Sequence, residues 1–326
     1  RREEEADRIV WAARRAVARL VHAPAPEGVV FTMNATQALN MGLKGILRPG
    51  DHVITSAVEH NALWRPLKTL EQRGWISLDV LPCDDEGFFY PADIGRFVRP
   101  NTRLVAMLHA SNVLGTVLPV GEIGRVARER GLYFLLDAAQ TAGTYPIDME
   151  EMHIDLLAFA GHKGLFGPHG TGGLVLRPDL RLDTLIEGGT GGQSELERQP
   201  DELPQRLESG TLNAVGIAGL LAGVEFVLSE GVERIRAHEM ELVEYLSSGL
   251  RRIPGALLYG PREVRDRTAV VTVNFVGYDP SQLAAVLDEM FDIAVRAGLH
   301  CAPQAHRVAG TIESGSLRLS PGYFNT

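Results

Sequence analysis

Two apolar runs of the chain end in residues that could carry out covalent chemistry. The run 155–163 ends in Lys163, and the run 133–140 contains Asp137 near its end. A lysine amine can bind an aldehyde cofactor covalently, and an aspartate can keep a pyridine nitrogen protonated so that the ring accepts electrons. The pair therefore predicts a site for pyridoxal 5′-phosphate (PLP). Alone, each residue is more often a solvated loop lysine or a turn-forming aspartate.

A second group of residues could bind the phosphate and the ring of such a cofactor. Asn34, Ala35 and Thr36 open a helix directly after an apolar run. Amides at a helix N-terminus and a threonine hydroxyl favour a phosphate. His60 follows the run 52–55 and could stack on a planar ring and move protons. In isolation, helix capping by Asn34 or Thr36 and an ordinary loop position for His60 are the commoner roles.

Asn112 and Arg318 could contact a substrate. Asn112 follows the apolar run 103–109 and could donate to a cofactor oxygen or to a substrate carboxylate. Alternatively, Asn112 could be an ordinary loop residue without a role in binding. Arg318 could hold a carboxylate through two parallel hydrogen bonds.

Cys301 is the candidate nucleophile. It lies in a loop bounded by glycine and proline, beside His300 and near Arg296. Nearby positive charge favours the thiolate, which is the reactive form. The alternative is a buried, inert thiol, which is what we expect of Cys83.

The elements that must position these residues alternate along the first two thirds of the chain. Such apolar strands, separated by helices, predict a mostly parallel sheet covered on both faces, with ligands beyond the carboxyl ends of the strands. Strands are predicted at 29–32, 52–55, 76–82, 103–109, 132–137, 156–160 and 173–176, and helices at 3–22, 36–47, 62–73 and 120–130.

In the last third of the chain, helices and strands do not alternate regularly, and this pattern predicts a smaller C-terminal α+β domain. We expect a large cofactor-binding domain at 1–230 and a small domain at 231–326. One long helical stretch is predicted at 214–252, with strands at 269–275 and 317–319 and a helix at 280–290.

Composition excludes several classes of protein. The 326 residues are 45% hydrophobic and 22% charged, with a net charge of −9 and no basic stripe, which argues against nucleic-acid binding. Two cysteines make a disulfide framework improbable and favour a reducing cytoplasm. No apolar run approaches the ~20 residues of a membrane span, and no signal peptide is visible. Both chain ends look like cuts. No metal site is expected.

In their order along the chain, these motifs resemble the class V aminotransferase group of fold-type I PLP enzymes. Within that group they are similar to the cysteine desulfurases and selenocysteine lyases. The resemblance runs from about Val29 to Thr326. It implies the α/β fold of PLP-dependent transferases of fold type I, with a mostly parallel sheet, helices on both faces and the smaller α+β domain.

The resemblance also implies a role for each motif. The cofactor-binding residues would be Ala35 and Thr36 at the phosphate, His60 stacked on the ring, Asp137 at the pyridine nitrogen, Gln140 at the phenolic oxygen, His162 and Lys163 in the covalent attachment turn, and Thr211 at the phosphate of a neighbouring subunit. The substrate-binding residues would be Asn112 and Arg318, and the catalytic residues Lys163, Cys301 and His60.

Two positions depart from the family pattern. Ala160 stands where the family often has Ser or Thr, so that one phosphate donor is missing. Leu299 stands where relatives of this subgroup often carry a second histidine, which would alter acid–base assistance near Cys301.

The resemblance implies a cytoplasmic, homodimeric cysteine desulfurase that converts L-cysteine to L-alanine. A persulfide forms on Cys301 and passes to a sulfur-acceptor protein. The alternatives are a selenocysteine lyase that acts on L-selenocysteine, or another class V lyase, epimerase or aminotransferase. Cys301 discriminates among them, because only persulfide formation strictly needs that thiol. A non-catalytic partner in sulfur delivery is a weaker alternative.

Overall fold

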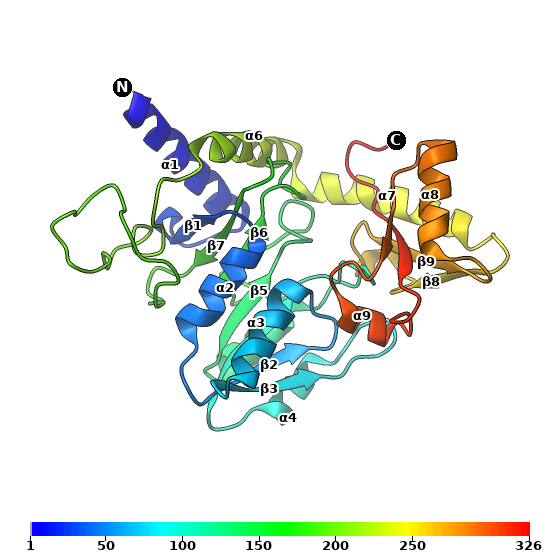
Figure 1. The fold of residues 1–326 in the computed structure, drawn as a ribbon, viewed down its shortest axis with the longest axis horizontal. Helices are drawn as coiled ribbons and strands as arrows, with labels where there is room; N and C mark the ends of the chain where they lie inside the picture. Colours follow the sequence, from blue (N-terminus) through cyan, green and yellow to red (C-terminus); the bar gives the residue numbers. More distant parts are fainter. Residues whose placement is uncertain (1) are drawn as a thin grey trace.

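The computed structural model describes residues 2–326 and contains two β-sheets that lie side by side (Figure 1). The larger sheet has seven strands in the order β1-β7-β6-β5-β4-β2-β3, and the smaller has four in the order β10-β11-β9-β8. The large-sheet strands are β1 Val29–Thr32, β2 Asp51–Ser56, β3 Ile76–Leu81, β4 Thr102–Leu108, β5 Tyr133–Asp137, β6 Leu156–Ala160 and β7 Gly172–Leu176. The small-sheet strands are β8 Ala256–Tyr259, β9 Val271–Phe275, β10 Arg296–Gly298 and β11 Ser316–Leu319.

The large sheet is parallel from β3 to β6, and β7 runs antiparallel to both of its neighbours, β6 and the edge strand β1. The small sheet is antiparallel throughout. The described α-helices are α1 Arg2–Leu20, α2 Ala35–Ile46, α3 Asn61–Gln72, α4 Ile94–Phe97, α5 Val120–Glu129, α6 Ala214–Glu230, α7 Val232–Leu250, α8 Pro280–Phe291 and α9 Pro303–Val308.

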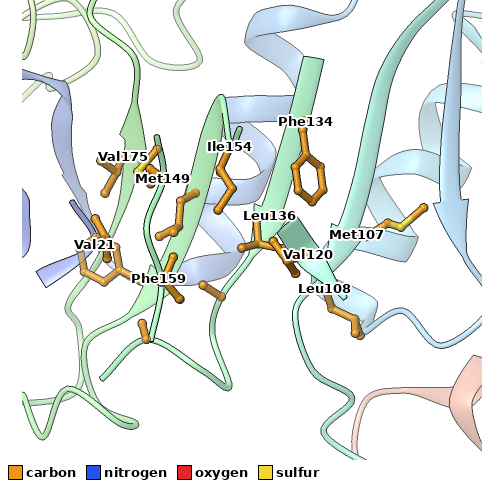
Figure 2. Close-up of a cluster of buried hydrophobic side chains, with 14 of the residues drawn as sticks. Val21, Met107, Leu108, Val120, Phe134, Leu136, Met149, Ile154, Phe159 and Val175 are labelled. Carbon is orange, nitrogen blue, oxygen red and sulfur yellow. The ribbon is translucent and has the colours of Figure 1, made fainter. Parts of the chain in front are cut away.

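Helices cover both faces of the large sheet. Successive side chains of a strand point to opposite faces. Phe134 and Leu136 of β5 pack into a cluster with α1, α5 and α6 (Figure 2), whereas Leu135 packs into a second cluster with α2 and α3. Full burial of such a side chain is worth roughly 1.5–3 kcal/mol. The two clusters therefore hold the strands, and hence the ends of the strands, in fixed positions.

The predicted architecture is confirmed: a mostly parallel sheet with helices on both faces, and a smaller α+β part. The predicted strands and helices of residues 2–176 agree with the structure to within one or two residues. The short elements α4, β8, β10 and α9 were missed. The two sheets fall within residues 29–176 and 256–319, and the domain boundary at residue 230 stays a prediction.

One element prediction was wrong. The stretch 214–252 is not one helix but two, α6 and α7, which meet at an angle of 83°. Gly231 lies between them with φ 87°, a backbone conformation that side chains other than glycine avoid. Helical periodicity continues on both sides of this glycine, so the pattern alone concealed the break.

Within residues 2–326, no single helix has the length and apolar character needed to cross a membrane. The bent pair α6–α7 meets that test only when the two helices are taken together.

Candidate active site

The carboxyl ends of the parallel strands and the N-terminus of α2 surround a cavity of about 260 Å³. Most of the predicted site residues line this cavity, although they come from segments that are far apart in sequence. They are Ala35, Thr36, His60, Asn112, Asp137, Gln140, His162 and Lys163. The structure therefore brings these eight together, as the order of the strands requires.

Lys163 and Asp137 face the same cavity from the ends of β6 and β5. Burial lowers the pKa of the Lys163 amine, an effect that the Asp137 carboxylate partly opposes. The lower pKa leaves more of the amine unprotonated and nucleophilic. Asp137 is buried, and its Oδ1 accepts a hydrogen bond from the Ala139 amide at 3.0 Å, which fixes the carboxylate at the end of its strand.

The N-terminus of α2 supplies a place for a phosphate. Asn34 caps the helix, because its side chain accepts from the Gln37 amide at 2.9 Å. Ala35 and Thr36 line the cavity in the first turn, where helix amides lack partners within the helix. Gly172 of β7 lets the two segments approach, since any Cβ there would lie 2.7 Å from the Asn34 carbonyl carbon.

His60 sits between β2 and α3 as the residue that caps α3. Its Nδ1 accepts from the Ala62 amide at 3.0 Å. A backbone amide can only donate, so Nδ1 is unprotonated and Nε2 carries the hydrogen of the neutral ring. Burial lowers the pKa of His60, with Asp137 acting in the opposite direction and Lys163 in the same one. The ring is therefore neutral at pH 7.

Glu59 is a buried carboxyl that sequence reasoning missed. Both of its oxygens accept from the Leu108 amide, at 3.2 and 3.0 Å, and the Ser56 hydroxyl donates to Oε1 at 2.5 Å. These bonds tie the end of β2 to the end of β4. Burial raises the pKa of Glu59 to about 8, and the negative charge of Asp137 adds to the shift. The only signal in the sequence was its position directly before His60.

Cys301 and Arg318 do not line the cavity, but they lie close enough to Lys163 to shift its pKa. Arg318 on β11 donates from Nη1 to the Asn112 carbonyl oxygen at 3.1 Å. Burial lowers the pKa of Arg318, and so does Arg296. The thiol of Cys301 is exposed. The predicted nucleophile therefore belongs to an exposed residue that lies close to the half-buried Lys163.

Arg296 lines the cavity and was treated in the sequence only as a charge near Cys301. It is paired with Arg318 across the β10–β11 ladder. Two arginines placed opposite each other repel unless an anion lies between them or beside them. The sequence could not reveal this pair, because β10 was not predicted.

Three further predicted positions have mixed outcomes. Thr211 is exposed and does not line this cavity. His162 is exposed at the cavity edge, and its ring centroid lies 4.8 Å from that of His169. Ala160 lines the cavity, so the hydroxyl donor that the family often has at this position is absent from the cavity wall.

Among residues 2–326, no group of three or more His, Cys, Asp or Glu side chains is arranged to hold a metal.

The residues present fit PLP. The cavity offers the amine of Lys163 with its lowered pKa, the carboxylate of Asp137, the amides at the N-terminus of α2 and the flat ring of His60. The Oδ1 atom of Asn112 is buried and lacks a hydrogen-bond partner within the protein. A buried polar atom of this kind calls for a ligand donor or a water molecule.

Comparison with known proteins agrees with the resemblance found in the sequence. The family model Aminotransferase class-V matches residues 1–326. A probable cysteine desulfurase of Methanothermobacter thermautotrophicus is 36% identical over 98% of this chain and 81% of that protein. A protein named cysteine desulfurase IscS, from Dictyoglomus turgidum, is 31% identical over 96% of this chain and 79% of that protein.

Solved structures agree. The apo structure of the cysteine desulfurase from Thermococcus onnurineus NA1 is similar with a TM-score of 0.93 and 34% identity, covering 100% of this chain and 82% of that one. The Escherichia coli cysteine desulfurase CsdA is similar with a TM-score of 0.90 and 27% identity, covering 99% of this chain and 81% of that one. The predicted fold type I is therefore confirmed, and the chain belongs to the class V aminotransferase family.

Proposed function

We propose that this protein is a PLP-dependent cysteine desulfurase, which converts L-cysteine to L-alanine and leaves a persulfide on Cys301. The observation that carries the proposal is an exposed cysteine beside a half-buried lysine and a half-buried arginine. Cys301 is exposed and lies close enough to Lys163 and Arg318 to affect the pKa of both. A class V enzyme that only transaminates or epimerises has no use for a thiol at this place. The names of the similar proteins agree with the proposal.

PLP would be held by the residues of the cavity. Ala35 and Thr36 would bind its phosphate, and His60 would stack on its ring. Asp137 would pair with its pyridine nitrogen, and Gln140 would donate to its phenolic oxygen. When bound, PLP supplies an electron sink for a carbanion at the Cα of an amino acid.

His162 and Lys163 complete the cofactor side of the site. Lys163 would anchor the cofactor through Nζ and, once its amine is released, take the proton from the substrate Cα. The lowered pKa of Lys163 suits both tasks, because each needs an unprotonated amine.

His60 has a narrower role than the sequence implied. Its Nδ1 is engaged by the Ala62 amide and its Nε2 already carries a hydrogen. To pass on a proton, the ring would first have to bind a second one, which its burial disfavours. We therefore assign His60 to stacking and to hydrogen-bond donation from Nε2.

The substrate carboxylate would bind at Arg318 and Asn112, with Arg296 on the neighbouring strand adding positive charge. The sulfur of L-cysteine would then face Cys301. Attack by the thiolate forms the S–S bond as the Cβ–S bond breaks, and the former Cβ gains a proton. L-cysteine and one thiol thus become L-alanine and one persulfide, with no other reactant.

We also propose a homodimer and a sulfur-acceptor protein. Thr211 is exposed and outside its own cavity, which suits a contact with the phosphate of a second subunit. The exposure of Cys301 suits transfer of its sulfur to another protein. Cys83 and Cys301 are both free thiols, which fits a reducing cytoplasm.

The test compares Cys301→Ser with the parent and with Cys83→Ser as a matched control. Alanine is measured from L-cysteine and from L-selenocysteine, and the mass of the peptide around residue 301 is checked for an added sulfur. We expect Cys301→Ser to keep the yellow absorbance of the cofactor and to lose alanine formation from L-cysteine, with Cys83→Ser unchanged. If Cys301→Ser forms alanine from L-cysteine at the parent rate, the proposal fails. Retention of activity on L-selenocysteine alone by Cys301→Ser identifies a lyase for that substrate.

A further inference from the structure

The backbone around Cys301 is in an unusual conformation. His300 and Cys301 are consecutive residues with φ values of 50° and 58°. Left-handed conformations of non-glycine residues cost on the order of 1–2 kcal/mol each. Two in succession persist only when contacts from the surrounding structure hold them. We call residues 299–302 the thiol loop.

Two hydrogen bonds from the large-sheet side hold the thiol loop at consecutive carbonyl groups. The Asn112 side chain donates from Nδ2 to the His300 carbonyl oxygen at 2.7 Å. The backbone amide of Asn61 donates to the Cys301 carbonyl oxygen at 2.8 Å. Both donors belong to segments that also line the cofactor cavity, since Asn61 directly follows His60.

These donors are themselves fixed. The Asn112 carbonyl oxygen accepts from Arg318, and the next carbonyl, that of Val113, accepts from the Thr272 hydroxyl at 2.5 Å. Asn61 is the first residue of α3, which His60 caps. The thiol loop is therefore held by the segments around Asn112 and His60, which also position the predicted substrate carboxylate and the cofactor ring.

We propose that Asn112 and the Asn61 amide form a clamp that positions the thiol of Cys301 for attack. Asn112 is thus a positioning residue for the nucleophile as well as a predicted substrate contact. The two roles are compatible, because the amide has two hydrogens and the His300 carbonyl uses one. Its Oδ1 is buried and unpaired within the protein. The part of the proposal that concerns turnover rests on the proposed desulfurase function.

The clamp can be opened one bond at a time. Asn61→Pro removes the backbone amide hydrogen together with the polar side chain, and proline suits the first position of a helix. The preceding residue, His60, has φ −71° and ψ 151°, which is the conformation favoured before proline. Asn61→Ala keeps the amide and is the matched control. Asn112→Leu removes the other bond, and its control is Asn101→Leu, which removes a similar 2.8 Å bond to the Gly50 carbonyl far from the site.

The first measurement is hydrogen–deuterium exchange of the peptide that contains the thiol loop, in the PLP-loaded enzyme without substrate. We expect faster exchange in Asn61→Pro and Asn112→Leu than in the parent. The two control variants should match the parent. If the exchange rate is unchanged in both test variants, the clamp is refuted. It is also refuted if Asn61→Ala and Asn61→Pro accelerate exchange equally. This measurement does not depend on whether the protein is a desulfurase.

The second measurement separates positioning from substrate binding. For alanine formation from L-cysteine, we expect Asn61→Pro to lower kcat by about tenfold, the effect of losing one positioning hydrogen bond, with KM unchanged. Asn112→Leu should lower kcat and also raise KM. A rise in KM alone for both variants contradicts positioning. A parent that forms no alanine refutes the proposed function, while the exchange data still decide the clamp.

Discussion

At the scale of single residues, burial sets the protonation states that the site needs. It lowers the pKa of Lys163 and of His60, and it raises the pKa of Glu59 to about 8. The lowered pKa values favour the neutral forms of the Lys163 amine and the His60 ring, and the raised pKa of Glu59 favours its protonated form.

Glu59 gives the protein a testable dependence on pH. Its pKa in the folded state, about 8, lies above the ordinary value of 4.5. The folded state therefore binds more protons than the unfolded state between these values, and the free energy of unfolding falls as the pH rises from 4.5 to 8. We expect Glu59→Gln, which mimics the protonated form, to lose part of this dependence.

The measurement is Tm at pH 6 and at pH 8.5 for the parent and for Glu59→Gln. The difference between the two Tm values should be smaller in the variant, and at pH 8.5 the variant should be the more stable protein. Glu239, with a pKa raised by burial to about 7, contributes a similar slope to both proteins and cancels in the comparison. Equal pH slopes would show that Glu59 is ionised throughout.

At the scale of elements, the junction of α6 and α7 joins the two sheets. Helix α6 packs along α1 on the large sheet, and α7 leads away towards the small sheet (Figure 1). The 83° bend at Gly231 sets this direction. The bend thus decides where β10 and β11, with Arg296 and Arg318, lie relative to the cavity.

Substitution of Gly231 tests the importance of this bend. No atom lies within 4 Å of a Cβ built on Gly231, so Gly231→Ala introduces backbone strain without a clash. We expect it to destabilise the protein by about 1–3 kcal/mol and to lower Tm by a few degrees. Gly249→Ala is the control, because that glycine is exposed within α7 and alanine should raise Tm slightly. Equal effects of the two substitutions would argue against strain at Gly231.

At the scale of the whole molecule, one protomer does not provide every predicted cofactor contact. Thr211 lies outside the cavity of its own chain. If Thr211 serves the site of a second subunit, each site is made by two chains. A dimer formed from two different inactive variants would then contain one intact site.

Mixed dimers test this directly. Lys163→Ala removes the anchor of a site, and Thr211→Val removes a hydroxyl while keeping a side chain of similar size. We expect each variant alone to form alanine slowly. Dimers reassembled from equal amounts of both should regain roughly a quarter of the parent rate, since about half of them are mixed and each mixed dimer has one intact site. Activity of the mixture equal to the mean of the two single variants would place Thr211 outside the shared site.

The sequence by itself determined most of the strands and helices and most of the cavity. Apolar periodicity marks buried strands and amphipathic helices locally, and the carboxyl ends of parallel strands must share one edge. Asp137 ends such a strand, and Lys163, His60 and Asn112 each follow one, so their order along the chain is enough to place them together. The chemistry of each also follows from its residue type.

Only the tertiary structure decided the features that depend on contacts between segments distant in sequence. The bond from Asn112 to His300 spans 188 residues, and Arg296 meets Arg318 only because β10 and β11 pair. Glu59 gained its raised pKa from burial, and His60 gained its fixed tautomer from one hydrogen bond. Such effects depend on packing to a fraction of an ångström. Local sequence patterns carry no information at that precision, because they record which face of an element is apolar and not what lies opposite it.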